Sequence, residues 1–231
     1  MEFLKEAEIM KQLCHERLIK LLAVCTEREP FCIVTELMKK GNLQKYLKSH
    51  SEARNLEFSL LNGFAIQIAE GMVYLEEKCC IHRDLRTENV LLTEMLCCKI
   101  SDFGLAQLLQ NDQGWMSHDA KVPIKWMAPE IFREYSYTVK SDVWSFGVLL
   151  TEIVSYGEVP FPGKNNNEFV KDLLDGANIS PPASCPDNLH DIVLQCWNQN
   201  SERRPTFKQL QAMLMKCNPM LKTEEELLLS T

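Results

Sequence analysis

The sequence lacks several features that would each indicate a particular class of protein. No apolar run approaches the ~18 residues that span a membrane, so we expect no membrane span. The formal net charge is -7, which argues against nucleic acid or an anionic membrane as a broad electrostatic partner. The start Met1-Glu2-Phe3 is not that of a secretory signal, and Glu2 excludes N-myristoylation. These absences favour a cytoplasmic protein that binds no nucleic acid.

Metal-binding spacing is also missing among the ten cysteines. Cys79-Cys80 and Cys97-Cys98 are adjacent pairs, whereas a zinc site uses pairs separated by a gap. The other cysteines fall inside apolar runs, which favours small buried residues with free thiols over a metal-binding or redox protein. Free thiols at this density suit a reducing compartment. The cysteines in apolar runs are Cys14, Cys25, Cys32, Cys185, Cys196 and Cys217.

The composition is that of a globular protein, with 45% hydrophobic and 25% charged residues in 231, enough for one large domain or two small lobes. Two short apolar runs, 21–25 and 31–35, flank a turn at 26–30 and predict a hairpin. Residues 37–41 break the pattern and resemble a linker. Apolar residues at three- and four-residue spacing predict helices along the rest of the chain. These stripes are Phe3-Ala7-Met10-Cys14, Phe64-Ile68-Met72-Leu75, Val143-Phe146-Leu150-Val154, Leu189-Val193-Cys196 and Phe207-Leu210-Leu214.

Three motifs carry the chemical signal of the chain. His82-Arg83-Asp84 has Asn89 five residues beyond its aspartate, Asp102-Phe103-Gly104 follows, and Ala128-Pro129-Glu130 comes third. Each motif alone has little meaning, but together and in this order they fit phosphoryl transfer from a magnesium nucleotide to a hydroxyl.

On these motifs the chain resembles the protein kinases, and within them the protein-tyrosine kinases of the cytoplasmic Src, Brk, Frk and Srms group. The resemblance covers nearly all of the chain, from about Phe3 to about Lys216. It implies an α+β fold with a mostly helical large lobe and a remnant of the small lobe, made of one helix and two strands. The implied divisions are 1–36 for the partial small lobe, 37–41 for the hinge and 42–231 for the large lobe.

The resemblance also implies the roles of the catalytic residues. Asp84 would orient the substrate hydroxyl and accept its proton, while Asn89 and Asp102 would be magnesium ligands. Arg86 and the segment Pro123-Ile124-Lys125-Trp126 take the form found in tyrosine kinases, although Thr87-Glu88 replaces the Ala-Ala of Src-like kinases. We therefore expect an enzyme that uses ATP and Mg²⁺ and acts on tyrosines of protein substrates.

The remaining site residues are expected to bind the nucleotide or to hold the structure. Thr35 would be the gatekeeper at the back of the nucleotide pocket, Leu91 its floor, and Glu36 and Met38 the backbone partners of adenine. Glu6 would pair with a small-lobe lysine. His82 and Phe103 would form a buried stack with Met10 and Leu21, and Asp142 would brace the catalytic loop. Glu130 and Arg204 would form a buried ion pair.

Two parts of the kinase pattern are missing from the sequence. Only five residues precede Glu6, and neither a glycine-rich phosphate loop nor a suitably placed lysine lies among them, since Lys5 neighbours Glu6 on the same helix. We interpret the sequence as a fragment of a tyrosine kinase that is inactive or weak as given, with adaptor domains encoded upstream. The alternative is a pseudokinase-like scaffold that binds partners without phosphoryl transfer.

The activation segment departs from the pattern as well. No tyrosine or threonine lies between Asp102 and Glu130, Gly114 stands where Src-like kinases have their activating tyrosine, and Ser117 is the only hydroxyl. Gln107 replaces the usual arginine, and Arg83, which would dock a phosphotyrosine, has no such partner. Regulation by phosphate-induced ordering of this segment is therefore not expected in its usual form.

Overall fold

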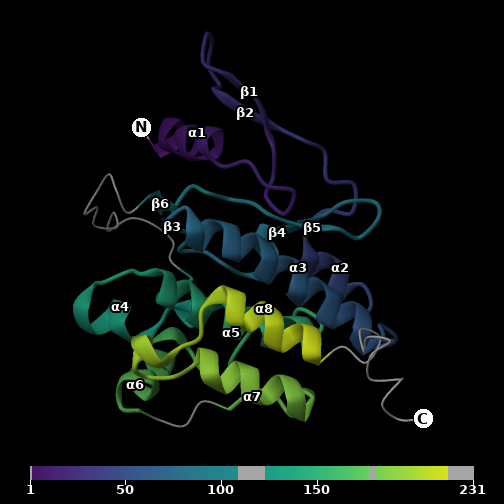
Figure 1. Ribbon diagram of the computed structural model, residues 1–231, viewed down its shortest axis with the longest axis vertical. Helices are drawn as coiled ribbons and strands as arrows, with labels where there is room; N and C mark the ends of the chain where they lie inside the picture. Colours follow the sequence, from purple (N-terminus) through teal and green to yellow (C-terminus); the bar gives the residue numbers. More distant parts are fainter. Residues whose placement is uncertain (1, 109–122, 177–179, 218–231) are drawn as a thin grey trace.

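The N-terminal part of the molecule is a helix and a hairpin, which lie together at the top of Figure 1. Helix α1 spans Glu2–Gln12, and the antiparallel strands β1 (Leu21–Cys25) and β2 (Cys32–Thr35) form the hairpin. The helix and hairpin expected here are confirmed, except that the helix ends before Cys14 and the second strand begins after Phe31. The structure, a computed structural model, describes residues 2–108, 123–176 and 180–217.

Helices dominate the lower part of the molecule, where α3 crosses above α5, α7 and α8 (Figure 1). The apolar stripes of the sequence fall on helices, with the exception of Cys14, which confirms the α+β fold class with a mostly helical body. The helices are α2 (Leu43–Lys48), α3 (Phe58–Glu77), α4 (Pro129–Glu134), α5 (Val139–Val154), α6 (Asn166–Leu174), α7 (Asp187–Cys196) and α8 (Phe207–Lys216).

Short strands and single turns of 3-10 helix lie between the helices. Within the described residues there are three two-stranded sheets, ordered β1-β2, β3-β6 and β4-β5, and each pair is antiparallel. The strands of the last two sheets lie before, between and after two of the motifs, at residues 82–89 and 102–104. Their strands are β3 (Cys80–Ile81), β4 (Val90–Leu92), β5 (Cys98–Ile100) and β6 (Gln107–Leu108), and the 3-10 turns are η1 (Thr87–Asn89), η2 (Ile124–Trp126) and η3 (Ser201–Arg203).

Helix α5 lies at the centre of the core. Thr138 begins it with a capping box, in which its side chain accepts from a backbone N–H of the first turn and the Ser141 hydroxyl oxygen accepts from the backbone N–H of Thr138. Every residue from Ser141 to Val154 is buried, including the polar side chains of Asp142 and Glu152. Because buried charges need partners, these two carboxylates mark places where the helix holds other segments.

Helix α3 is long and apolar enough to be a candidate membrane span by length and composition alone. Half of its most apolar window is buried inside the protein, where the helix packs against α8, α5 and β5. The core helix of a globular protein meets the same criterion, so this helix by itself does not indicate a membrane span.

Gly147 of α5 allows close contact with the end of α7. A Cβ at this position would lie 2.7 Å from Cβ of Cys196 and 2.8 Å from Nε1 of Trp197. We therefore expect Gly147→Ala to lower the free energy of unfolding by ~1–3 kcal/mol, measured by urea denaturation. Gly63 of α3 is the matched control, because a Cβ there meets nothing within 4 Å. Gly63→Ala should raise stability by ~1 kcal/mol, and equal effects of the two changes would contradict this packing argument.

The cysteines differ from the expectation of general burial. All ten are free thiols, and four of them are buried: Cys80, Cys98, Cys185 and Cys196. The prediction was wrong for Cys14, Cys25 and Cys32, which are exposed. These three lie on the N-terminal helix-and-hairpin part, where one face of the apolar runs points away from the core.

Candidate active site

The loop that carries His82, Arg83 and Asp84 is held in place by hydrogen bonds to Asp142 of α5. The two carboxylate oxygens of Asp142 accept hydrogen bonds from the backbone N–H groups of His82, at 2.7 Å, and Arg83, at 2.9 Å. Arg83 has a left-handed backbone with φ of 68°. Asp142 therefore satisfies two buried donors of the loop and holds its turned conformation, as the sequence resemblance implied.

Asp84 and Asn89 face each other across the loop. The Asn89 Nδ2 group donates to Oδ2 of Asp84 at 2.7 Å and to its backbone carbonyl at 2.8 Å. Nε of Arg86 lies 3.0 Å from Oδ1 of Asp84, and Nη1 of Arg86 lies 2.8 Å from Oε2 of Glu88. Because Nδ2 of Asn89 is used on Asp84, its Oδ1 is the atom that remains for a metal ion.

Ser101 connects this loop to Asp102. Its backbone N–H and its hydroxyl both donate to the carbonyl of Asn89 at 2.8 Å, and its own carbonyl lies 3.0 Å from Nε2 of His82. Asp102 follows with φ of 65°, a conformation that turns the chain sharply. The next residue, Phe103, is buried with its ring centroid 5.3 Å from that of His82. The backbone thus brings Asn89 and Asp102 to neighbouring positions.

Carboxylates gather where Asp102 meets α1. A Cβ built on Gly104 would lie 3.3 Å from Oδ1 of Asp102 and 3.8 Å from Oε2 of Glu6, so all three share one small space. Burial raises the pKa of Glu6, and the charge of Asp102 adds to that rise. Burial also raises the pKa of Asp84, against the opposing effect of Arg86, and Asp102 again contributes to the rise. Negative charges that repel one another in this way favour the presence of a cation.

The oxygen donors fit a magnesium ion that is shared with phosphates. Among the described residues no group of three or more His, Cys, Asp or Glu side chains could hold a metal ion. Asn89 and Asp102 would supply two hard oxygen ligands, which matches the way Mg²⁺ binds through one or two side chains plus phosphate and water. The site therefore suits a metal ion that arrives with a nucleotide.

The residues expected to bind the nucleotide lie at the end of β2, directly after it, and in β4. Thr35 ends β2 opposite Leu21, Leu91 is half-buried in β4, and Met38 is buried. The Glu36 side chain accepts from the backbone of Lys20 and from Nζ of Lys99 at 2.7 Å. No backbone hydrogen bond uses the Glu36 carbonyl or the Met38 N–H within the described part of the chain. Both groups are thus free for a ligand.

Glu130 and Arg204 form the expected buried ion pair. Both Nη atoms of Arg204 bind the two oxygens of Glu130 at 2.7 Å, and the arginine side chain is 0% exposed. Arg204 also donates to the carbonyls of Asn198 and Lys140 and lies over the ring of Trp144. Its donors are therefore almost fully used, and the pair joins the start of α4 to the segment before α8.

Glu152 is a residue of the site that the sequence reasoning missed. Its carboxylate accepts from the backbone N–H and the hydroxyl of Thr87, at 3.1 and 2.7 Å, and from Nε1 of Trp126 at 3.0 Å. It thereby connects the catalytic loop to the segment that includes Trp126, and Ser145 strengthens the link by donating to the Trp126 carbonyl. A lone glutamate inside the apolar stretch of α5 was the available signal, because such a charge requires buried partners.

The buried carboxyl of Glu152 should make stability depend on pH. Burial raises its pKa to about 7 from 4.5, and the hydrogen bonds from Trp126 and Thr87 oppose this only in part. The folded state then binds more protons than the unfolded state between these values, so the free energy of unfolding falls as pH rises through that window. The full fall is on the order of 3 kcal/mol. Urea denaturation across this pH range measures it.

Glu152→Gln removes the titrating group. The free energy of unfolding of this variant should therefore lack the fall that Glu152 causes in the wild type between about pH 4.5 and about pH 7. Glu158 is the matched control, since its side chain is 61% exposed. Glu158→Gln should follow the pH profile of the wild type. Parallel profiles of wild type and Glu152→Gln would contradict the assignment.

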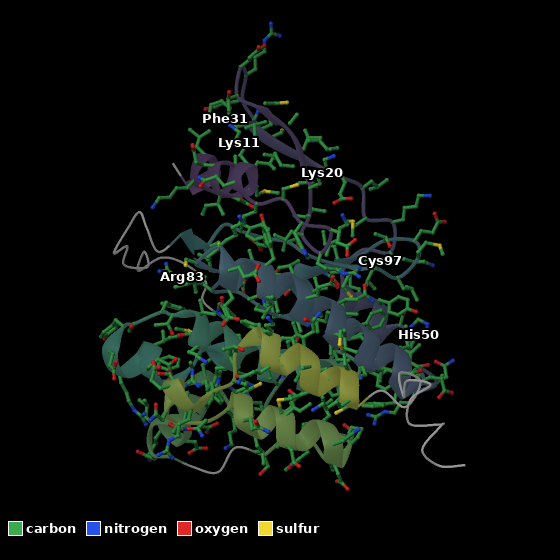
Figure 2. All side chains as sticks on the ribbon, viewed as in Figure 1. Lys11, Lys20, Phe31, His50, Arg83 and Cys97 are labelled. Atoms are coloured by element: carbon green, nitrogen blue, oxygen red, sulfur yellow. The ribbon has the colours of Figure 1, made fainter. Side chains whose placement is uncertain are left out.

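Arg83 lies beside an aromatic ring at the side of the molecule, between β3 and α4 (Figure 2). Its guanidinium carbon is 4.8 Å from the centroid of Tyr137. This ring contact stabilises the cation without a phosphate group. Gly114 and Ser117 lie outside the described residues, and Gln107 takes part in β6 through its backbone.

Comparison with known proteins agrees with this geometry. Residues 1–214 match a family model described as protein tyrosine and serine/threonine kinase. The chain is 47% identical over 218 residues to the tyrosine-protein kinase Srms of Homo sapiens. That match covers 93% of this chain and 44% of the relative, so the chain spans less than half the length of that protein.

Proposed function

The chain belongs to the protein tyrosine and serine/threonine kinase family, and on this premise we propose that it is a catalytic region that transfers the γ-phosphate of ATP to tyrosine hydroxyls of proteins. One observation carries the proposal. Asn89 holds the Asp84 carboxylate at 2.7 Å, while Ser101 binds the Asn89 carbonyl and leads directly into Asp102. Phosphoryl transfer requires these oxygens side by side at the phosphates and the acceptor hydroxyl.

Each residue has a separate part in the proposed reaction. Asp84 orients the acceptor hydroxyl and takes its proton, and burial favours this because it raises the pKa of the carboxyl. When bound, the magnesium nucleotide supplies the phosphoryl group and offsets the charge of the phosphates. Asn89 and Asp102 would hold its magnesium ion, and the backbone groups of Glu36 and Met38 would hold its base, with Thr35 as gatekeeper and Leu91 as floor.

Tyrosine is the proposed acceptor because of the segment beside the loop. Arg86 lies over the ring of Trp126, with 5.7 Å between the guanidinium carbon and the ring centroid. Lys125 donates to the carbonyls of Pro160 and Phe161, which fixes the same segment to the body. These contacts fix the segment beside the loop, which supports its proposed role as the docking surface for a tyrosine side chain.

The rest of the proposal concerns the setting of this catalytic region. We place it in the cytoplasm, consistent with free thiols at every cysteine and with the resemblance to a cytoplasmic group of kinases. Protein substrates that contain tyrosine are its proposed partners, and adaptor domains belong to the proposed whole protein. The divisions at residues 36 and 41 are proposed as the edges of the hinge.

The test uses two polypeptides. One is limited to residues 1–231, in which no glycine-rich loop or suitably placed lysine precedes Glu6. The other places the glycine-rich strand and the lysine-bearing strand of a tyrosine kinase ahead of residue 1, and is called the extended polypeptide below. We expect little or no transfer from the first and magnesium-dependent transfer from the second, since one preorganised contact is worth ~3–4 kcal/mol in the transition state.

Two matched peptides that are identical except for a tyrosine or a serine acceptor identify the substrate class. Transfer of radiolabelled phosphate from ATP to each peptide is measured. Labelling of the tyrosine peptide alone supports the proposal. Labelling of the serine peptide alone would contradict the acceptor, and an inactive extended polypeptide that still binds the magnesium nucleotide would favour a scaffold.

A further inference from the structure

The hairpin of β1 and β2 ends in a pair of cysteines. Cys25 and Cys32 are direct partners in the antiparallel register and are the last pair before the turn at 26–31. The side chains of the neighbouring pair, Val24 and Ile33, are half-buried, whereas those of Cys25 and Cys32 are exposed. Because side chains alternate between faces along a strand, both thiols lie on the same open face of the hairpin.

Direct partners in this register have the separation that a disulfide requires. Opposite residues in antiparallel strands have Cα atoms about 4.5–5.5 Å apart. A disulfide accepts Cα separations of about 4.4–6.8 Å, so this register is compatible with a disulfide. Sγ of Cys32 lies 3.3 Å from the carbonyl of Pro30, which belongs to the adjoining turn.

Access favours the same pair. The hairpin extends beyond α1 at the top of the molecule, where Phe31 of its turn is labelled in Figure 2. Cys14 is also exposed, but it lies outside the strands and has no cysteine as a register partner. The buried thiols Cys98 and Cys196 have pKa values raised by burial, which disfavours the reactive thiolate.

We propose that Cys25 and Cys32 form a reversible disulfide within the chain when the protein meets a peroxide. One thiolate attacks the O–O bond of hydrogen peroxide, which gives a sulfenic acid and releases hydroxide. The second thiol then attacks that sulfur, the S–S bond forms and water leaves. In total two thiols lose two electrons and two protons, and one peroxide becomes two waters. Thiol reductants reverse the reaction by exchange, as expected for a transient disulfide in a reducing compartment.

The bond would close the turn at 26–31 into a covalent ring. It joins the two strands at the end remote from Thr35, so it prevents the hairpin from opening at its tip. The site is a modification site on the hairpin and does not depend on whether phosphoryl transfer occurs.

Tryptic mapping tests the proposal directly, because the sequence places a cleavage site between the two cysteines. Trypsin cuts after Lys20, Arg28 and Lys39, so Cys25 falls in peptide 21–28 and Cys32 in peptide 29–39. The 231-residue protein is treated with hydrogen peroxide, blocked with an alkylating reagent and digested without reductant. We expect peptides 21–28 and 29–39 to appear as one species, about 2 Da lighter than their sum, that separates after reduction.

Single cysteine variants serve as controls. Cys32→Ser should abolish the joined species, while Cys14→Ser should leave its yield unchanged. Both residues are exposed, so the folded state should tolerate serine at each. The proposal is overturned if peroxide leaves both thiols free, converts them separately to sulfinic acids, or joins Cys25 to a second chain as a disulfide dimer on a non-reducing gel.

Discussion

Asp84→Asn is expected to lower kcat of the extended polypeptide by ~10²–10⁴-fold, because the amide accepts no proton from the acceptor hydroxyl. The change keeps the shape of the side chain, and the Asn89 amide at 2.7 Å still has an oxygen to donate to. KM for the magnesium nucleotide should therefore change little. Steady-state kinetics with the tyrosine peptide measure both constants.

Asp102→Asn separates the role of a metal ligand from that of a base. It should raise KM for the magnesium nucleotide as well as lower kcat, since a hard cation loses a charged oxygen ligand. Asp172→Asn is the matched control, because Asp172 pairs with Lys164 at the surface. Equal effects of the changes at Asp84 and Asp102 on both constants would contradict the separate roles.

Arg204→Met is expected to lower the free energy of unfolding by ~3–5 kcal/mol, the largest stability effect predicted for this chain. The Arg204 side chain is 0% exposed and that of Glu130 is 12% exposed. Among the described residues, removal of the guanidinium would leave Glu130 with the Ser141 hydroxyl, at 3.1 Å, as its remaining donor. A buried charge without its partner is costly, and urea denaturation gives the size of the cost.

Lys164→Met is the matched control for this prediction. It breaks the pair with Asp172, in which the side chains are 47% and 39% exposed, so the cost should be ~0–1 kcal/mol. The double change Glu130→Leu with Arg204→Met should recover much of the loss, because apolar packing can replace a buried ion pair. A double variant less stable than Arg204→Met alone would contradict this account.

The parts of the fold that the sequence predicted are those with a long apolar period. Helices α3, α5, α7 and α8 each bury a stripe of residues, so the spacing alone locates them. Helix α6 buries only Phe169 and Leu173, which is too short a pattern to recognise, although Asn165 and Glu168 form a capping box at its start. The pairing of β3 with β6 joins segments distant in sequence, for which no local signal exists.

For the site, sequence motifs supplied residue identities and the structure supplied their connections. The roles of Asp84, Asn89 and Asp102 remain predictions, but Ser101 accounts for their proximity, and no motif had indicated Ser101. The link from Glu152 to Thr87 and Trp126 depends on the packing of α5 against two distant segments. A hydrogen bond across sixty-five residues leaves no periodic trace in one sequence.

The way in which α5 holds the loop bears on how the protein should respond to heat. Asp142, in its first turn, and Glu152, in its last, fix the two ends of the segment that runs from His82 to Thr87. This segment cannot loosen while the central helix keeps its place, since each buried carboxylate would lose its donors. Thermal inactivation should therefore coincide with global melting, and a folded protein with a disordered catalytic loop should not accumulate on the way.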